Sequence, residues 1–275
     1  MMQDNFQLSK GLRYTMVLET FALAPPALIV YFFTGFARSQ WAWTIPPFNA
    51  KFIGAIWMAA VILLAICAWT GRWIPTRIAL PIDLIFTGVA LAVSVAGWSS
   101  FFPTRWGTWA WFAAYILFPV HAAIALWRYR GRGPAQASPV PAALNALLIA
   151  ESIVFGFYGL LELLAPVQAS AFWPWQVDAF HGRIYAGVFV GLAVSTWMIS
   201  ASGAALEYLS LGLTKVAIGV LVLLGTASVD AQVHRVDWAD ISTRVWIGVF
   251  AALALCGLAS AAYGLRRLRR QPLPS

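Results

Sequence analysis

The chain has 275 residues, of which 61% are hydrophobic and only 10% are charged, with a formal net charge of +8. A soluble domain carries roughly 25% charged residues, so this chain cannot cover its apolar surface in water. The composition therefore excludes a soluble globular protein. It predicts an integral membrane protein whose principal partner is the lipid bilayer.

Apolar segments long enough to cross a bilayer recur along the whole chain. A hydrocarbon core about 30 Å thick takes about 20 residues of α-helix, and a helix satisfies its own backbone amides there, which excludes strands. The segments predict an all-α, polytopic membrane helical bundle with short loops, so any function must lie within the bundle. In chain order, the segments are 12–35, 50–70, 75–98, 107–128, 141–165, 183–202, 207–228 and 243–265.

Lysine and arginine are distributed unequally between the two sides that these crossings define. The positive-inside rule places the richer side, which holds both termini, in the cytoplasm, and we expect a membrane of the bacterial inner type. The basic clusters at 128–132 and 266–270 fit topology signals that contact lipid headgroups, so no nucleic-acid partner is expected. The richer side holds Lys10, Arg13, Arg72, Arg77, Arg128, Arg130, Arg132, Arg266, Arg267, Arg269 and Arg270.

The two halves of the chain match under a shift of 132 residues, which brings Glu19 onto Glu151. We predict two tandem four-helix repeats, residues 1–132 and 141–275, joined by a linker at 133–140 and followed by a basic C-terminal tail. Each half crosses an even number of times, so the repeats are parallel. The other matches are Trp41 with Trp173, Trp43 with Trp175, Phe48 with Phe180, Lys51 with Arg183 and Trp106 with Trp238.

Small residues recur at four-residue spacing in the second and sixth apolar segments. In lipid, such stripes let helix backbones approach closely. We therefore predict that the second and sixth helices pack near the centre of the bundle. The small residues are Gly54, Ala55 and Ala59 in the second segment and Ala186, Gly187 and Gly191 in the sixth.

Several ionisable side chains lie inside the apolar segments, where each costs about 2.5–3.5 kcal/mol to insert. At the rise of an α-helix they lie about 10–15 Å below the predicted cytoplasmic ends and form one layer. One interpretation is a buried network that fixes helix registry, with Lys215 neutralising Asp83 or Glu151. The other is a proton or cation site, or a polar cavity for a small solute. The set comprises Glu19, Asp83, His121, Glu151 and Lys215, with Glu162 three turns from Glu151 on the same helix face.

A tryptophan-rich segment precedes both the second and the sixth helix on the predicted outer side. Interfacial belts of tryptophan explain such residues without any ligand. The alternative is a pair of caps that bind lipid headgroups, a sugar or a partner protein. The first segment holds Trp41, Trp43, Phe48 and Lys51, and the second holds Trp173, Trp175, Phe180 and Arg183.

The sequence carries no P-loop, nucleophile elbow, zinc-protease helix or dinucleotide fingerprint. We therefore do not expect an enzyme, although catalytic groups scattered over several helices would leave no such signature. No metal site is predicted, and one intramembrane histidine, His121, leaves the cofactor unassigned.

Two functions remain open. The first is a small-solute or proton-coupled transporter, which predicts a polar cavity between the halves that reaches the charged layer. The second is a non-catalytic membrane subunit that binds lipid, pigment or a partner protein through its tryptophan-rich segments. That function predicts a tightly packed bundle with an exposed aromatic surface, assembled with a membrane-protein partner or a second copy.

Overall fold

The computed structural model describes residues 6–133 and 140–270, and each apolar segment forms a helix long enough to cross a membrane. The predicted all-α polytopic bundle is confirmed. Within the described residues, extended pairing is limited to two isolated bridges. The membrane helices are α1 (Lys10–Phe32), α3 (Pro47–Thr70), α4 (Trp73–Ala96), α5 (Trp106–Arg128), α6 (Ala142–Leu164), α8 (Ala179–Ser202), α9 (Ala205–Val233) and α10 (Ile241–Arg269).

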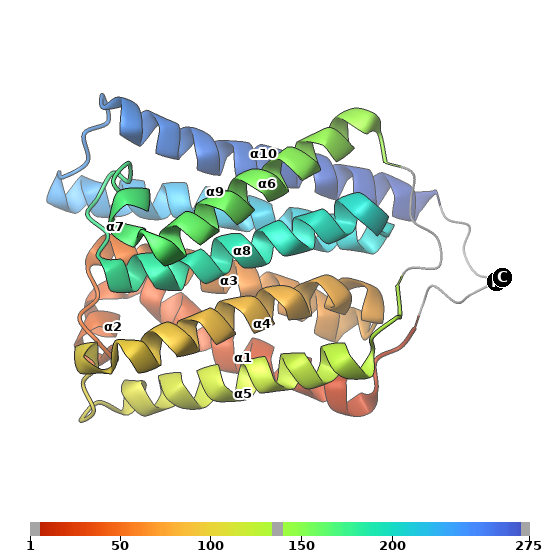
Figure 1. Ribbon diagram of the computed structural model, residues 1–275, viewed down its shortest axis with the longest axis horizontal. Helices are drawn as coiled ribbons and strands as arrows, with labels where there is room; N and C mark the ends of the chain where they lie inside the picture. The colour runs from red at the N-terminus through yellow and green to blue at the C-terminus, as the bar shows by residue number, and fades with distance from the viewer. Residues whose placement is uncertain (1–5, 134–139, 271–275) are drawn as a thin grey trace.

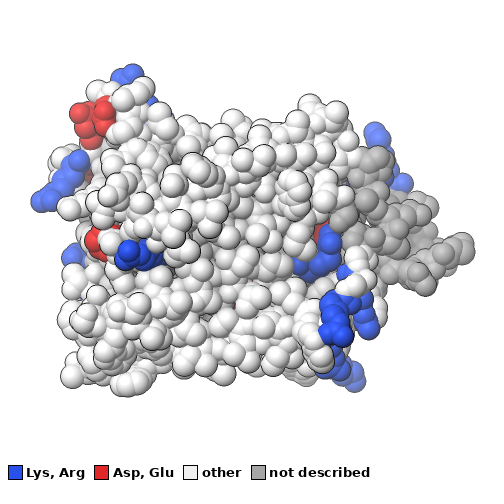
Figure 2. All heavy atoms as spheres, in the orientation of Figure 1, with Lys and Arg blue, Asp and Glu red and all other residues white. Residues whose placement is uncertain are grey.

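The membrane helices run side by side, and the described chain begins and ends at the same end of the bundle (Figure 1). We call this the basic end, defined by the arginines of residues 72–77 and 266–269. The opposite end, the tryptophan end, is formed by the connections at 33–46, 97–105, 165–178 and 234–240 and includes the short helices α2 (Thr34–Gln40), η1 (Trp98–Ser100) and α7 (Pro166–Ala169). Figure 2 shows the charged side chains gathered toward the two ends, with a largely uncharged band between them. This distribution fits an integral membrane protein.

Local sequence signals fix where individual helices begin and end. The carboxylate of Asp178 caps α8 by accepting hydrogen bonds from the backbone amides of Phe180 and His181, each 3.0 Å long, which satisfies donors that a helix N-terminus leaves free. Gly71 ends α3 with a φ of 59°, a left-handed conformation that glycine adopts without strain. Asp230 accepts from the amides of Arg235 and Val236 and so holds the turn after α9.

Helix pairing crosses the boundary between residues 6–133, the first half, and residues 140–270, the second half. Within the halves, α1 packs on α3 and α4 on α5, as α6 packs on α8 and α9 on α10. Between the halves, α3 packs on α9 and α4 on α8. Each of these pairs has a counterpart under the shift of 132 residues. The tandem repeat itself stays a prediction, and most of its linker lies outside the described residues.

The small residues of α3 and α8 make close approaches to other helices. A Cβ atom on Gly54 would lie 2.9 Å from the backbone nitrogen of Tyr31 in α1, and one on Gly187 would lie 3.0 Å from the Cα of Phe86 in α4. The small residues therefore bring α3 against α1 and α8 against α4. Between α3 and α8, the rings of Phe52 and Tyr185 are in contact, with centroids 4.6 Å apart. Buried or close-packed members of the two stripes are Ala55, Ala59, Ala186 and Gly191.

Candidate functional site

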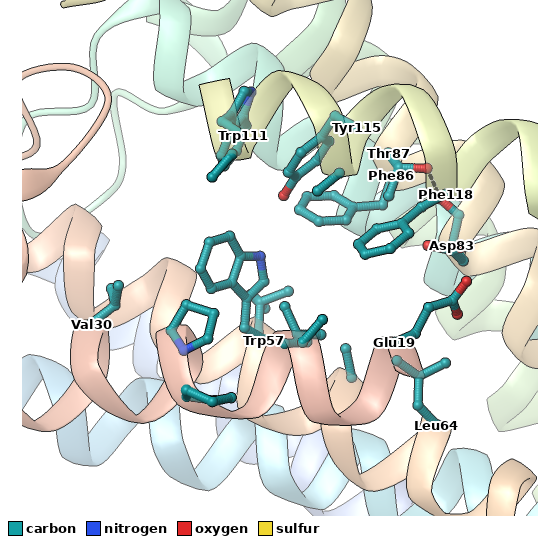
Figure 3. Close-up of a pocket in the computed structure, with 18 of the residues that line it drawn as sticks. Glu19, Val30, Trp57, Leu64, Asp83, Phe86, Thr87, Trp111, Tyr115 and Phe118 are labelled. Carbon is teal, nitrogen blue, oxygen red and sulfur yellow. Dashed lines mark hydrogen bonds between the residues drawn. The ribbon is translucent and has the colours of Figure 1, made fainter. Parts of the chain in front are cut away.

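A cavity of about 630 Å³ lies among α1, α3, α4 and α5 and extends to α8 and α9. Its walls are almost wholly apolar. Two carboxyl side chains, Glu19 from α1 and Asp83 from α4, line one end, and Figure 3 shows them pointing toward each other. The volume falls within the range of about 300–1,000 Å³ that is typical of small-molecule sites.

The carboxyl group of Glu19 is paired with His121 of α5. The His121 Nδ1 atom lies 2.9 Å from Glu19 Oε1, and Nε2 lies 2.7 Å from the Thr15 hydroxyl oxygen. That hydroxyl donates its single hydrogen to the Leu12 carbonyl oxygen, so Nε2 must be the donor to Thr15. The 2.9 Å separation of Nδ1 and Oε1 is that of an ion pair, in which the two charges cancel.

Asp83 has no comparable partner. Its Oδ2 atom is buried, and no described residue forms a hydrogen bond with it. The hydroxyl of Thr87, one turn further along α4, donates to the main-chain oxygen of Asp83 at 2.5 Å. Since the Glu19–His121 pair is neutral, Asp83 is the uncompensated acid of the cavity. In a low-dielectric site it must either carry a proton or face a cation.

Aromatic side chains cover the cavity wall between its two ends. Figure 3 shows Trp57 of α3 facing Trp111 and Tyr115 of α5 across the cavity. The rings of Trp111 and Tyr115 stack with centroids 3.9 Å apart, and those of Trp57 and Trp111 are 6.2 Å apart. Aromatic faces carry partial negative charge, so this wall can attract a positively charged group as well as an apolar one.

Three of the cavity helices contain prolines in their interior. These are Pro25 and Pro26 in α1, Pro81 in α4 and Pro119 in α5. The other described membrane helices contain none inside. A proline removes one helical hydrogen bond and lets the helix bend. Pro81 and Pro119 each stand two residues before an ionisable group of the site, so bending at these prolines would move Asp83 and His121.

The corresponding charges of the second half form a closed ion pair. Lys215 Nζ lies 2.8 Å from Glu151 Oε1, and the Cys256 thiol donates to Glu151 Oε2 at 2.7 Å. The side chain of Lys215 is fully buried. The predicted single layer is thus divided into two clusters, and Lys215 neutralises Glu151 instead of Asp83. Asp83 and Lys215 occupy equivalent positions under the shift of 132 residues. The first half therefore places a second acid near Glu19, whereas the second half places a base beside Glu151.

The remaining predicted acid, Glu162, belongs to neither cluster. The hydroxyl of Tyr158 donates to its carboxylate, and the indole nitrogen of Trp173 donates to Tyr158 at 2.6 Å. A second cavity of about 320 Å³ lies beside this group, and apolar and aromatic residues of α6, α8 and α10 form nearly all of its lining. The structure therefore corrects the expectation of a polar cavity between the halves. The large cavity is apolar and lies chiefly within the first half.

An ion pair that the sequence did not reveal joins the two halves at the basic end. Arg77 of α4 binds the carboxylate of Glu207 in α9 with two hydrogen bonds of 2.8 and 3.0 Å. Glu207 also accepts from the backbone amide of Ala204 at the start of α9. From the sequence alone, Arg77 was interpreted only as one of the basic residues that set the topology. The position of Glu207 at the third residue of its helix was the one available indication of a capping role.

Of the predicted caps at the tryptophan end, Trp43, Phe48, Trp173 and Trp175 are buried inside the molecule, whereas Arg183 is exposed. Trp43 is 1% exposed, and its indole nitrogen donates to His181 Nε2 at 3.0 Å. Nε2 is therefore an acceptor, so the hydrogen lies on Nδ1, which donates to Asp178 at 2.6 Å. Burial acts to raise the pKa of Asp178, but the hydrogen bonds from His181 and two amides lower it to about 2.

Contacts between the two caps are reciprocal, because a tryptophan of each cap packs on the equivalent phenylalanine of the other. Trp43 packs on Phe180 with ring centroids 5.3 Å apart, and Phe48 stacks on Trp175 at 5.1 Å. The indole of Trp175 donates to Asn49, which corresponds to His181 under the shift. The caps thus close the bundle interior, which contradicts an exposed binding surface formed by these tryptophans. The basic residues are also engaged, with Lys51 bound to the carbonyl of Tyr31 and Arg183 to that of Leu163.

Both ring nitrogens of His121 face partners within the protein. Among the residues that the structure describes, no group of three or more His, Cys, Asp or Glu side chains is placed to hold a metal ion. Carboxyl and imidazole groups such as those of Glu19, Asp83 and His121 can bind and release protons and can bind cationic groups.

Comparison of the chain with protein-family models, with curated proteins and with solved structures finds no match.

Proposed function

We propose that the chain is a proton-coupled transporter of a small solute. The cavity of the first half would bind the solute, and Asp83, beside the neutral Glu19–His121 pair, would exchange a proton for it. The observation that carries this proposal is a carboxyl oxygen of Asp83, buried without a hydrogen-bond partner at the end of a cavity of about 630 Å³. Ionisable groups are retained inside membranes chiefly where they act on ions or substrates.

The interior prolines support the movement that transport requires. Alternating access needs helices that bend or rock around a binding site. Pro25, Pro26, Pro81 and Pro119 lie in three of the helices that line the cavity. The second half, whose ion pair is closed, has no interior proline in its described membrane helices. We propose accordingly that the first half moves around the second.

The proposal also gives the orientation of the protein in the membrane and the relation between its two halves. The basic end would face the cytoplasm, following the positive-inside rule, in a membrane of the bacterial inner type. The reciprocal contacts at the tryptophan end support two parallel repeats that have diverged, one into a transport site and one into a closed ion pair. Because the cavity is complete within one chain, no partner protein or second copy is needed.

Proteoliposomes that enclose a pH-sensitive dye test the proposal. A panel of cationic, neutral and anionic solutes is added outside, and proton movement is compared with that in protein-free vesicles. We expect at least one class of solute to drive proton movement in the wild type. Asp83→Asn should reduce the rate at least about tenfold, because the exchanging group no longer titrates. The matched control is Glu162→Gln, a buried acid outside the cavity.

Two results would contradict the proposal. One is the absence of solute-driven proton movement across the whole panel with correctly folded protein. The other is an equal rate for the wild type and Asp83→Asn, which would remove the carboxyl group from the mechanism. A loss of rate in Glu162→Gln that matched the loss in Asp83→Asn would also count against it, since the effect would then reflect the bundle as a whole.

A further inference from the structure

The cavity leaves one negative charge to be compensated. Glu19 and His121 lie 2.9 Å apart as an ion pair whose charges cancel. Asp83 is therefore the single acid whose ionisation leaves a net charge at this end. A solute that replaces the proton of Asp83 must supply one positive charge. A dication would leave an excess positive charge in an apolar site, and an anion would meet a second negative charge.

The lining offers few oxygen ligands near Asp83 for a bare inorganic cation. Such an ion exchanges its water only for several oxygen ligands. Besides the two carboxyl groups, Thr87 and Thr214 contribute hydroxyl groups to the lining, and each is bound to the main chain of its own helix at 2.5 and 2.9 Å. The other polar side chains of the lining are Gln40 of α2, at the tryptophan end, and the tyrosine and tryptophans of the aromatic wall. The rest of the wall is aliphatic or aromatic. It can replace the hydration of an apolar body but not that of a small ion.

The aromatic wall favours a positively charged group with such a body. Trp57, Trp111 and Tyr115 line the middle of the cavity, and Phe86 and Phe118 lie between them and the acidic end (Figure 3). Cations are attracted to the faces of aromatic rings within about 6 Å, most strongly to tryptophan. An organic cation can therefore contact Asp83 with its charge and the rings with its body. A neutral apolar solute would use only the rings.

We propose that the solute of this cavity is an amphipathic organic monocation, whose charge lies against Asp83 and whose apolar body fills the space between Trp57, Trp111 and Tyr115. This inference rests on the proposed function, because it names the solute class of the same site. It also fixes the direction of coupling. Proton and cation compete for one carboxyl group, so they must move in opposite directions across the membrane.

Competition makes the affinity for the cation increase with pH. When a cation binds to the protonated site, one proton passes from Asp83 to the solvent. The titratable groups that face this site come from three helices besides α4: Glu19 from α1, Cys67 from α3, and His121 and Tyr115 from α5. On α9, the cation Lys215 is held by Glu151 and so does not compensate Asp83.

Binding of tetraphenylphosphonium to the whole purified protein in detergent tests the inference. Tetraphenylborate has the same shape with the opposite charge, and triphenylphosphine oxide is a neutral analogue. Equilibrium dialysis should show saturable binding of the cation, at least about tenfold tighter than that of either analogue, which corresponds to about 1.4 kcal/mol. Asp83→Asn should lose that preference, Trp57→Leu should weaken cation binding, and Glu162→Gln should retain it.

Proton release gives a second measurement that needs no variant. In weakly buffered solution, the wild type should release up to one proton for each cation bound, and binding should tighten as the pH rises. Cation binding without proton release and with equal affinity in Asp83→Asn would overturn the inference. So would an affinity for triphenylphosphine oxide or tetraphenylborate equal to that for the cation.

The outcomes separate this inference from the proposed function. If tetraphenylphosphonium binds in an Asp83-dependent way but drives no flux in proteoliposomes, the site binds organic cations and transport is wrong. If a neutral or anionic solute drives Asp83-dependent proton movement while the cation does not bind, transport stands and the cation class is wrong. If there is neither binding nor flux, both fail.

Discussion

At the scale of single residues, the two halves of the molecule treat an intramembrane glutamate differently. Glu151 meets the fully buried ammonium group of Lys215 at 2.8 Å, whereas Glu19 meets His121 and lies beside Asp83. The sequence predicted that all of these residues belong to one layer of ionisable side chains within the membrane. It did not predict which would pair, because pairing depends on which helices become neighbours, and several acids were available to Lys215.

The Glu151–Lys215 pair gives a prediction about stability. Glu151→Gln removes the carboxylate and leaves a buried ammonium group without a counter-charge, which typically costs about 3–5 kcal/mol. The double variant Glu151→Gln with Lys215→Met removes both charges and should recover most of the lost stability. Thermal unfolding in detergent measures this. A double variant as unstable as the single variant would contradict the assignment of the pair.

The cap residue Asp178 gives a prediction about pH. Its pKa in the folded protein is about 2, below its ordinary value of 3.8, so the ionised carboxylate stabilises the folded state above about pH 4. This contribution is lost as the pH falls from about 4 to 2. Asp178→Asn keeps an oxygen to cap α8 but does not titrate, whereas Asp178→Ala loses the cap and about 1 kcal/mol.

Unfolding of the three proteins in detergent at a series of pH values checks this prediction. The difference in stability between the wild type and Asp178→Asn should shrink between pH 4 and pH 2. The difference between Asp178→Asn and Asp178→Ala should stay constant over the same range. A wild-type advantage that was as large at pH 2 as at pH 5 would show that Asp178 does not act through its charge.

At the scale of elements, composition and segment length were sufficient to predict every membrane helix. The boundaries differ where capping residues extend a helix beyond its apolar run. The segment predicted at 183–202 begins at Ala179, because Asp178 caps α8, and the segment predicted at 207–228 continues to Val233, where Asp230 holds the following turn. Burial of the tryptophan-rich segments was not predictable in this way. An interfacial belt and a buried cap have the same composition.

Close packing of α8 on α4 gives a prediction at the same scale. A side chain at Gly187 would meet the backbone of Phe86, with its Cβ 3.0 Å from the Cα, whereas nothing lies within 4 Å of a Cβ at Gly88 on α4. Gly187→Leu should therefore destabilise the bundle by about 1–3 kcal/mol. Gly88→Leu serves as the matched control and should leave stability unchanged. Equal unfolding temperatures for the two variants in detergent would contradict the packing described here.

At the scale of the whole molecule, the first half contains the large cavity and the second half a closed ion pair. The halves are joined by Arg77 with Glu207 at one end and by Trp43 with His181 at the other. The sequence indicated where the halves diverge, at Asp83 and Lys215, but not which of them would enclose a cavity. A cavity is a property of packed side chains from several helices and leaves no local pattern.

The most direct test compares the two halves in one assay. Solute-driven proton movement in proteoliposomes is measured for Asp83→Asn, which neutralises the acid of the first half, and for Glu151→Gln with Lys215→Met, which neutralises the ion pair of the second. We expect Asp83→Asn to reduce the rate of proton movement at least about tenfold, while the double variant retains it. Retention in Asp83→Asn together with loss in the double variant would contradict the assignment of transport to the cavity of the first half.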